Sequence, residues 1–188
     1  MTHMLEIRWH GRGGHGLVSA SNLLAEMAVK KGLYAQSIPI FGAERRGAPT
    51  RVFTRISDKP IRTRSSVKNP DIVIITDRHL LNIINPLEGL KKGGYVIINV
   101  DELTEAERSR LQDFKVIPVN AVEIALKADL KVGGIPLVNI PLLGVLVKLL
   151  DFIDIDVAEE VLKERWSGEI LEKNIKALKY AVEVVEIA

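Results

Sequence analysis

Six residues near the start of the chain, 11–16, have the composition of a phosphate-binding turn. Four of them are glycines, interleaved with one arginine and one histidine. Because glycine has no Cβ, its backbone N–H groups can approach a ligand closely, and N–H groups at the start of a helix carry partial positive charge. An apolar strand-like run precedes the turn and a helix-like run follows it. We therefore expect an anion, most simply a phosphate, to contact Gly11, Arg12, Gly13, Gly14, His15 and Gly16.

A dinucleotide such as NAD is the first ligand to compare with this turn. Gly11, Gly13 and Gly16 have the Gly-x-Gly-x-x-Gly spacing of the dinucleotide-binding fingerprint. That fingerprint also needs an acidic residue at the end of the second strand to bind the ribose hydroxyls, and residues 34–41 contain none. Another phosphate-bearing ligand therefore fits better than NAD. The structural alternative is that the glycines only allow a helix to pack closely on a strand.

Other polar residues are candidates for the same site. Ser19 and Ser21 fall in the first turns of the following helix, where a hydroxyl donates either to a ligand or to nearby backbone. Arg45 and Arg46 lie in a charged segment, residues 41–49, that contains glycines and ends in a proline. Adjacent guanidinium groups offer paired donors to a phosphate or a carboxylate. The alternative for this segment is a charged surface loop without a ligand.

The residues after this segment predict a β-hairpin. Residues 50–57 and 61–65 alternate polar and apolar side chains on either side of residues 58–60, which is typical of paired strands with one solvated or partner-covered face. Arginines at alternate positions would project from the same face of the sheet. Such a row of like charges indicates an acidic partner subunit at Arg51, Arg55, Arg62 and Arg64.

The sequence offers little for catalysis by this chain alone. It has no Ser-His-Asp arrangement, no HExxH motif and no P-loop lysine. Because it has no cysteine, it forms no disulfide, no thiolate metal site and no iron–sulfur cluster of its own. The histidines lack metal-ligand spacing. We expect neither a catalytic residue nor a metal site in this chain.

The composition is that of a globular protein. Hydrophobic residues make up 47% and charged residues 27% of 188 residues, which favours one domain over residues 1–188. No apolar run is long enough to span a membrane and no signal-peptide pattern opens the chain, so we expect a cytoplasmic protein with no membrane contact. The abundance of Lys, Glu and Arg without cysteine is consistent with a thermophile.

Charge is distributed unevenly along the chain. Residues 1–65 hold 11 Lys and Arg but 4 Asp and Glu, whereas the remainder is net negative. The glycine-rich turn lies in the basic part, which favours an anionic ligand or an acidic neighbour. The basic residues are scattered and are not interleaved with aromatic residues, so a nucleic-acid partner is not expected.

The order of the elements predicts an α/β fold. Apolar, strand-like runs at 5–9, 34–39, 71–75, 95–100 and 116–119 alternate with helix-like runs, of which the first covers 15–31. Strands that alternate with helices form a largely parallel sheet. We therefore expect a Rossmann-like, mostly parallel sheet flanked by helices, with a β-hairpin inserted around residues 50–65.

Capping patterns predict where several helices begin. Thr104 with Glu107, and Asn120 with Glu123, have the residue types that start helices. Asp156 is expected to cap a helix that ends near residue 167. The last helix has an apolar stripe that is typical of a core-facing surface, made of Leu171, Ile175, Leu178, Val182 and Val185.

Four segments together resemble the gamma subunit of the 2-oxoacid:ferredoxin oxidoreductases, the enzymes that act on pyruvate and 2-ketoisovalerate. They are residues 7–16, 41–49, 66–71 and 139–144, and the Phe-Gly-Ala-Glu-Arg-Arg-Gly block of the second is specific. The resemblance spans nearly the whole chain. It departs from the family pattern at His15, where glutamine is more usual, and this concerns a detail of ligand contact.

The resemblance implies a part of a larger enzyme. That enzyme decarboxylates a 2-oxoacid on thiamine diphosphate, passes electrons through iron–sulfur clusters to ferredoxin and transfers the acyl group to coenzyme A. The thiamine diphosphate belongs to the alpha and beta subunits, and the clusters to a delta subunit or an equivalent domain. The gamma subunit is expected to pack on the catalytic subunits and help bind coenzyme A at their interface. We expect the phosphates of coenzyme A to meet the turn at residues 12–16, together with Arg45 and Arg46.

Two other functions stay open. The smaller subunit of indolepyruvate ferredoxin oxidoreductase carries a similar domain and implies arylpyruvate substrates. A free-standing nucleotide-binding protein is the second alternative, and the missing acidic residue for the ribose counts against an NAD-binding form of it.

Overall fold

The computed structural model describes residues 4–40 and 47–187 of the chain. A six-stranded sheet with the order β2-β3-β1-β4-β5-β6 forms its centre, and β7 and β8 form a separate two-stranded sheet. The strands are β1 (Leu5–Arg12), β2 (Tyr34–Ile40), β3 (Pro49–Ser57), β4 (Ile72–Ile75), β5 (Tyr95–Asn99), β6 (Lys115–Val119), β7 (Lys131–Val132) and β8 (Ile135–Pro136). The helices are α1 (Leu17–Lys30), α2 (Leu80–Ile83), α3 (Glu105–Leu111), α4 (Ala121–Lys127), α5 (Asn139–Leu149), α6 (Ile155–Arg165) and α7 (Gly168–Val184).

The six-stranded sheet is mostly parallel, which confirms the predicted Rossmann-like α/β fold. Strands β1, β4, β5 and β6 pair in parallel, in that order. Strand β3 is antiparallel to both of its neighbours, β1 and β2. It follows that β3 alone runs against the other five strands.

The predicted hairpin around residues 50–65 is wrong in its second half. Strand β3 covers the first half, but its two edges already pair with β1 and β2. Residues 61–65 form no strand and lie beside β2, where Gln36 Nε2 donates to Ile61 O over 3.2 Å. Because a strand has only two hydrogen-bonding edges and both edges of β3 are occupied, residues 61–65 cannot pair with β3.

The four alternating arginines consequently do not form the predicted row on one face. Arg55 is buried, with 2% of its side chain exposed, and its Nε lies 2.8 Å from Glu6 Oε1 on β1. Arg51 is exposed on β3, whereas Arg62 and Arg64 are exposed on the segment without strand structure. The buried charge is balanced within the chain and needs no acidic partner.

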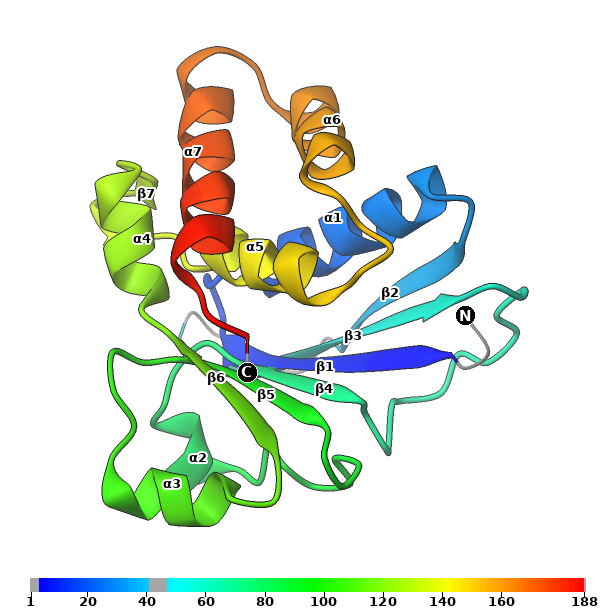
Figure 1. Cartoon of the computed structure of the whole chain (residues 1–188), viewed down its shortest axis with the longest axis vertical. Coiled ribbons are helices and arrows are strands. Elements are labelled where there is room, and N and C mark those ends of the chain that lie inside the picture. The colour runs from blue at the N-terminus through cyan, green and yellow to red at the C-terminus, as the bar shows by residue number, and fades with distance from the viewer. Residues whose placement is uncertain (1–3, 41–46, 188) are drawn as a thin grey trace.

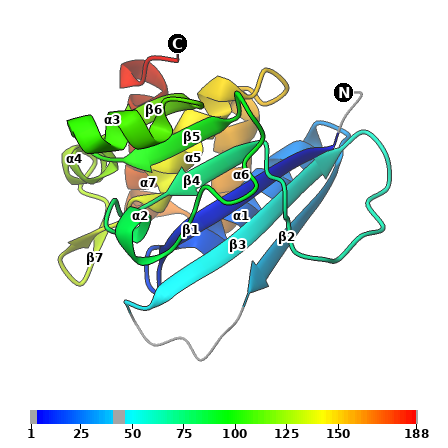
Figure 2. The same cartoon turned by 90° about the horizontal axis from the view of Figure 1, so that it is seen from below.

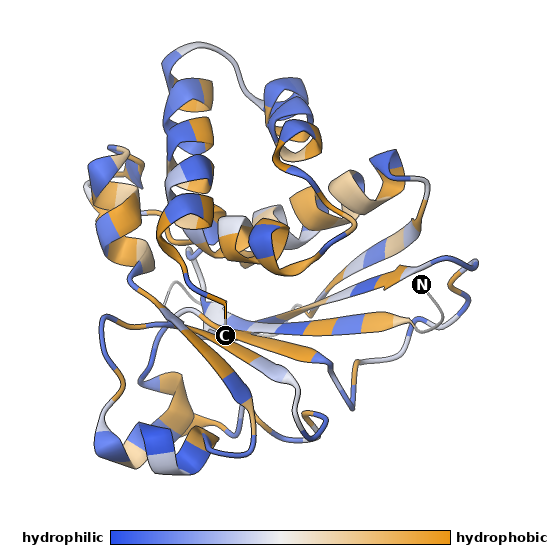
Figure 3. Ribbon diagram, viewed as in Figure 1, coloured by the Kyte–Doolittle hydropathy of each residue, from blue (hydrophilic) through white to orange (hydrophobic). Residues whose placement is uncertain are grey.

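Helices cover both faces of the sheet. Helices α1, α4, α5, α6 and α7 pack on one face, and α2 and α3 pack on the other (Figure 1). Figure 2, seen from the second side, shows α2 and α3 over the half of the sheet that contains β4, β5 and β6. The helices turn their apolar sides toward the strands, and α7 carries polar residues along its outer side (Figure 3).

The position of β4 in the sheet explains why its sequence is continuously apolar. All four of its residues are buried. Ile72 and Ile74 belong to the core beneath α1 and α5, while Val73 and Ile75 belong to the smaller core beneath α2 and α3. A strand with a hydrophobic layer on each side has no polar face, which is the usual situation in parallel sheets.

The direction of winding reverses between β1 and β4. These neighbouring parallel strands are followed by α1 on one face of the sheet and by α2 on the other. Their carboxyl ends therefore border a crevice, and this is the position where open α/β sheets bind ligands. The glycine-rich turn at residues 13–16 lies at that edge.

Of the three helix starts predicted from capping patterns, two are confirmed and one is displaced. Thr104 and Glu107 form a complete capping box at α3, and the Asn120 side chain accepts from Glu123 N at α4. Helix α6 begins earlier than predicted, because Asp154 rather than Asp156 accepts the hydrogen bond from Val157 N over 2.9 Å. The aspartate three residues before the free N–H is the one placed to cap it.

Only part of the predicted apolar stripe of α7 is buried. Leu178 and Val185 are buried, but Ile175 and Val182 are half-buried, and small residues occupy the centre of the contact with α5. There, a Cβ added to Gly144 of α5 would lie 2.7 Å from Leu178 O and 2.8 Å from Ala181 Cβ. Glycine at this position allows the two helices to approach closely.

The outer strands of the main sheet are β2 and β6, and each contains a proline, Pro39 and Pro118 respectively. Within the described ranges, no helix is both long and apolar enough to cross a membrane.

We predict that Gly144→Val lowers the free energy of unfolding by about 2 kcal/mol, because the added side chain overpacks the contact between α5 and α7. Urea unfolding of the purified chain measures this. Lys176→Val, which puts the same residue at an exposed position of α7, is the control and should have a smaller effect. Equal effects of the two substitutions would contradict the packing argument.

A second prediction concerns the start of α6. Asp154→Ala removes the cap of α6 and the contact of Asp154 Oδ2 with Lys31 Nζ, which are 2.9 Å apart, so Tm should fall by about 3 °C. Thermal unfolding followed by circular dichroism measures this change. Asp156→Ala serves as the matched control and should lower Tm less; a larger loss from Asp156→Ala would restore the cap position expected from the sequence.

Candidate functional site

The crevice between β1 and β4 brings together two segments that are far apart in the sequence. Residues 11–16 come from the end of β1, and residues 76–79 come from the end of β4. Strand β1 extends to Arg12, three residues beyond its predicted end, because Gly11 and Arg12 pair with Thr50 and Pro49 on β3. The turn proper is therefore residues 13–16, and α1 begins at Leu17 rather than at His15.

Different structural reasons explain why the individual positions of this turn are glycines. A Cβ at Gly11 would lie 2.5 Å from Thr76 Oγ1, and one at Gly16 would lie 2.6 Å from Asn139 Nδ2. Close packing, the structural alternative raised by the sequence, thus accounts for these two. Gly14 is different: it is exposed, has a φ of +96° and would meet no atom within 4 Å of an added Cβ. Its position is open to a ligand.

Some backbone N–H groups of the turn already donate hydrogen bonds within the chain. Gly13 N donates to Ala48 O over 2.9 Å, and His15 N donates to Arg12 O over 3.0 Å. Gly16 is the N-cap residue of α1 and provides no side-chain cap, and the first turn of the helix has no acidic residue. The first N–H groups of an α-helix have no partner within the helix. An anion at this end of α1 would meet unpaired donors and the positive end of the helix dipole.

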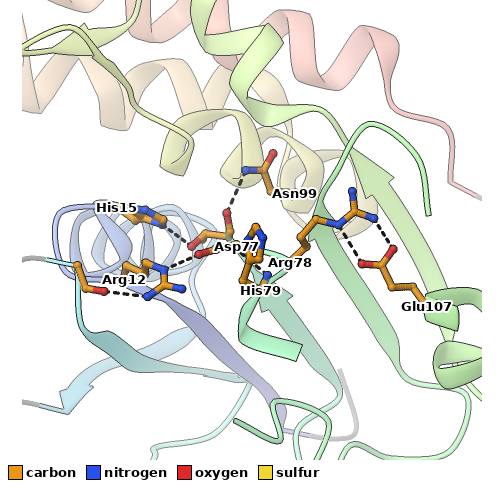
Figure 4. A network of polar contacts seen from close by, with 9 residues as sticks. Arg12, His15, Asp77, Arg78, His79, Asn99 and Glu107 are labelled. Atoms are coloured by element: carbon orange, nitrogen blue, oxygen red, sulfur yellow. Dashed lines mark hydrogen bonds and ion pairs between the residues drawn. The ribbon is translucent and has the colours of Figure 1, made fainter. Parts of the chain in front are cut away.

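Arg12 is held in place by a carboxylate that the sequence analysis did not single out. Its Nε forms an ion pair with Asp77 Oδ2, and its Nη1 donates to Gly47 O over 3.0 Å (Figure 4). Burial opposes ionisation of Asp77, but hydrogen bonds from Arg12 and His79 prevail and lower the pKa of its carboxyl to about 2. The Asp77 carboxyl is therefore ionised at neutral pH.

Asp77 also binds the residue two positions further along. Both the backbone N and the Nδ1 of His79 lie 2.9 Å from Asp77 Oδ1. One carboxylate thus contacts Arg12 on one side and His79 on the other, as Figure 4 shows. The only sequence signal for this role was the position of Asp77 two residues after a buried strand.

His15 lies beside the same group, with its Nδ1 2.6 Å from Thr76 Oγ1. Burial lowers the pKa of His15, and Arg12 lowers it further, while Asp77 acts in the opposite direction. At neutral pH the imidazole is therefore mainly uncharged, so it can form a hydrogen bond with a phosphate but contributes little charge.

A second residue missed by the sequence analysis is Asn139, the first residue of α5. It is buried, and its Nδ2 donates to Gly16 O over 3.4 Å. Its Oδ1 is buried and has no hydrogen-bond partner in the described part of the chain. Asn139 opens the 139–144 segment, one of the four that carry the family resemblance, and this segment contacts the glycine-rich turn at Gly16.

The other candidate residues do not all lie near the turn. Ser19 is half-buried in the first turn of α1, but Ser21 is buried and hydrogen-bonds to Thr54 Oγ1 at 2.7 Å and Ser37 Oγ at 2.8 Å. Ser21 therefore belongs to the core and not to the site. Arg45 and Arg46 lie outside the described residues. Among the residues described, no group of three or more His, Asp or Glu side chains could hold a metal ion.

A pocket of about 370 Å³ lies on the far side of Asp77 from the turn, between α2 and α3. Arg78, His79, Thr104 and Arg110 are among its lining residues. Arg78 is paired with Glu107, with its Nε 3.0 Å from Glu107 Oε1 (Figure 4). His79 thus belongs both to this pocket and to the polar contacts around Asp77.

Comparison with known proteins identifies the family. The sequence model of the pyruvate ferredoxin/flavodoxin oxidoreductase family matches residues 6–184. The gamma subunit common to the pyruvate and ketoisovalerate oxidoreductases of Thermococcus litoralis is 43% identical over 182 residues, which cover 96% of each chain. Pyruvate synthase subunit PorC of Methanothermobacter thermautotrophicus is 40% identical over 183 residues, 97% of each chain.

Comparison with solved structures supports the same family. The crystal structure of the pyruvate oxidoreductase subunit PORC from Thermotoga maritima superposes with a TM-score of 0.84 at 34% identity, over 97% of each chain. At 19% identity, a chain of the 2-oxoglutarate:ferredoxin oxidoreductase of Magnetococcus marinus, solved with coenzyme A bound, shares the fold with a TM-score of 0.77. This chain covers 31% of that longer one. The protein therefore belongs to the pyruvate ferredoxin/flavodoxin oxidoreductase family, as a gamma subunit that forms one part of a multi-subunit oxidoreductase.

Proposed function

We propose that this chain helps bind coenzyme A in an oxidoreductase that converts pyruvate or a related 2-oxoacid to acyl-CoA and CO2 and reduces ferredoxin. Its partners in this proposal are alpha, beta and delta subunits. The thiamine diphosphate, which stabilises the carbanion left by decarboxylation, and the iron–sulfur clusters belong to those partners. The absence of cysteine from this chain is consistent with that division.

The observation that carries the proposal is the uncapped start of α1 at the crevice between β1 and β4. Gly14 is exposed there, with space beside its Cα, and α1 has no acidic residue in its first turn to compete with an anion. Coenzyme A has a diphosphate that suits such a site. The fold shared with a coenzyme A-bound oxidoreductase supports this ligand.

Arg12 is the cation that this chain would direct to the diphosphate. Asp77 and Gly47 O hold two of its three guanidinium nitrogens, and the third has no partner in the described ranges. Restricting a side chain before the ligand arrives lowers the entropy lost on binding. Arg45 and Arg46 precede Gly47 in the sequence, and Gly47 N donates to Gly13 O, so we include both arginines in the proposed site. Gly13 N is left out, because Ala48 O already accepts from it.

We predict that Arg12→Gln raises the KM for coenzyme A in the assembled complex about tenfold, because a charged hydrogen bond to phosphate is lost. The KM for the 2-oxoacid should not change. Steady-state kinetics with each substrate varied in turn make the measurement. Arg62→Gln, at an exposed arginine outside the crevice, is the control. An unchanged KM for coenzyme A in both Arg12→Gln and the double variant Arg45→Ala/Arg46→Ala would exclude the proposed site.

A further prediction addresses the partners. The chain, tagged and recovered from its own host under anaerobic conditions, should appear in native mass spectrometry with larger chains that carry thiamine diphosphate and iron–sulfur clusters. Oxoacid assays on that complex then compare pyruvate, branched-chain oxoacids and arylpyruvates. Recovery as a lone chain would contradict the proposed partners.

A further inference from the structure

The pocket between α2 and α3 has the features of a second ligand subsite. Its volume of about 370 Å³ falls within the range of small-molecule sites in proteins. Its lining residue His79 contacts Asp77, whose carboxylate also binds Arg12 at the glycine-rich turn. A ligand that meets the turn with one part can therefore extend toward this pocket with another.

His79 lines the pocket, and one edge of its ring is held by a hydrogen bond. Asp77 Oδ1 lies 2.9 Å from its Nδ1, and 74% of the His79 side chain is exposed. The hydrogen bond fixes the ring without covering its faces. A planar imidazole with free faces is suited to stack against a nucleobase.

The charges in the pocket favour an anion. Arg78 is neutralised by its two contacts with Glu107. Arg110 has no carboxylate partner among the residues that the structure describes; its Nη1 donates to Leu81 O over 2.5 Å, which leaves its other donors available. A guanidinium without a counter-ion, beside a stacking surface, is the combination that recognises a nucleoside phosphate.

We propose that this pocket binds the nucleotide end of coenzyme A, with the adenine against His79 and the ribose 3′-phosphate at Arg110. The inference rests on the proposed function, which puts the diphosphate at the start of α1. It makes Arg110 a specificity-determining residue, because coenzyme A differs from dephospho-coenzyme A only by the 3′-phosphate.

The test uses the assembled complex and three compounds: coenzyme A, dephospho-coenzyme A and adenosine 3′,5′-bisphosphate. Arg110→Gln should raise the KM for coenzyme A and the inhibition constant of the bisphosphate about tenfold each, because a charge-assisted hydrogen bond is lost. The KM for dephospho-coenzyme A should stay unchanged. His79→Ala should raise the KM for both coenzymes about tenfold through loss of stacking.

Two variants of α3 serve as controls. Arg108→Gln makes the same change at an exposed arginine of the same helix that does not line the pocket, and it should behave like the wild type. Arg110→Lys keeps the cation and should retain most of the preference for coenzyme A over dephospho-coenzyme A. If Arg110→Gln prevents assembly of the complex, Arg110→Lys and His79→Ala are measured instead. The inference would be overturned if Arg110→Lys lost the preference for coenzyme A over dephospho-coenzyme A and His79→Ala left the KM for coenzyme A unchanged.

The outcomes separate this inference from the function on which it rests. A raised KM for coenzyme A in Arg12→Gln, with Arg110→Gln changing both coenzymes equally or neither, would overturn the nucleotide pocket and leave the proposed function standing. No change in Arg12→Gln, Arg45→Ala/Arg46→Ala, Arg110→Gln or His79→Ala would overturn both.

Discussion

The Asp77 carboxylate holds together the edge of the sheet on which the proposed site depends. Strands β1 and β4 are neighbours, but their following helices lie on opposite faces of the sheet, so the segments at their carboxyl ends diverge. Asp77 reconnects them, because it binds Arg12 at the end of β1 and His79 at the start of α2. With its pKa at about 2, this carboxyl remains ionised at any pH at which the protein is expected to work. The glycine-rich turn and the pocket between α2 and α3 consequently have a fixed relation to each other.

The glycines show how one motif can serve two purposes. Gly11 and Gly16 are required because Thr76 and Asn139 occupy the space beside them, whereas Gly14 faces open space. Gly11 allows the end of β1 to approach Thr76, and Gly16 allows the start of α1 to approach Asn139 of α5, while the open Gly14 leaves its position accessible. Packing and the proposed anion binding are therefore compatible explanations of the turn, since the first produces the geometry that the second needs.

Much of the fold could be predicted from local patterns, because helix caps and buried strands are determined by adjacent residues. The capping box at Thr104 and the cap at Asn120 are examples. The hairpin around residues 50–65 could not be judged in this way, since whether residues 61–65 find a strand partner depends on β2, which comes much earlier in the chain. Asp77 and Asn139 were missed for the same reason: their contacts with Arg12 and Gly16 join residues 65 and 123 positions apart. The glycine spacing predicted the candidate site, but only the sheet order shows what lies beside it.

The prolines in the two outer strands restrict how this chain can associate. An uncovered strand edge is a template on which another strand can add, and each added strand needs N–H donors along that edge. Pro39 in β2 and Pro118 in β6 each remove a donor from the strand that carries them. Extension of the sheet into a neighbouring chain is thereby disfavoured at both ends. Association with other subunits would then depend on side-chain surfaces, which can be matched to one partner, rather than on backbone pairing, which accepts almost any extended segment.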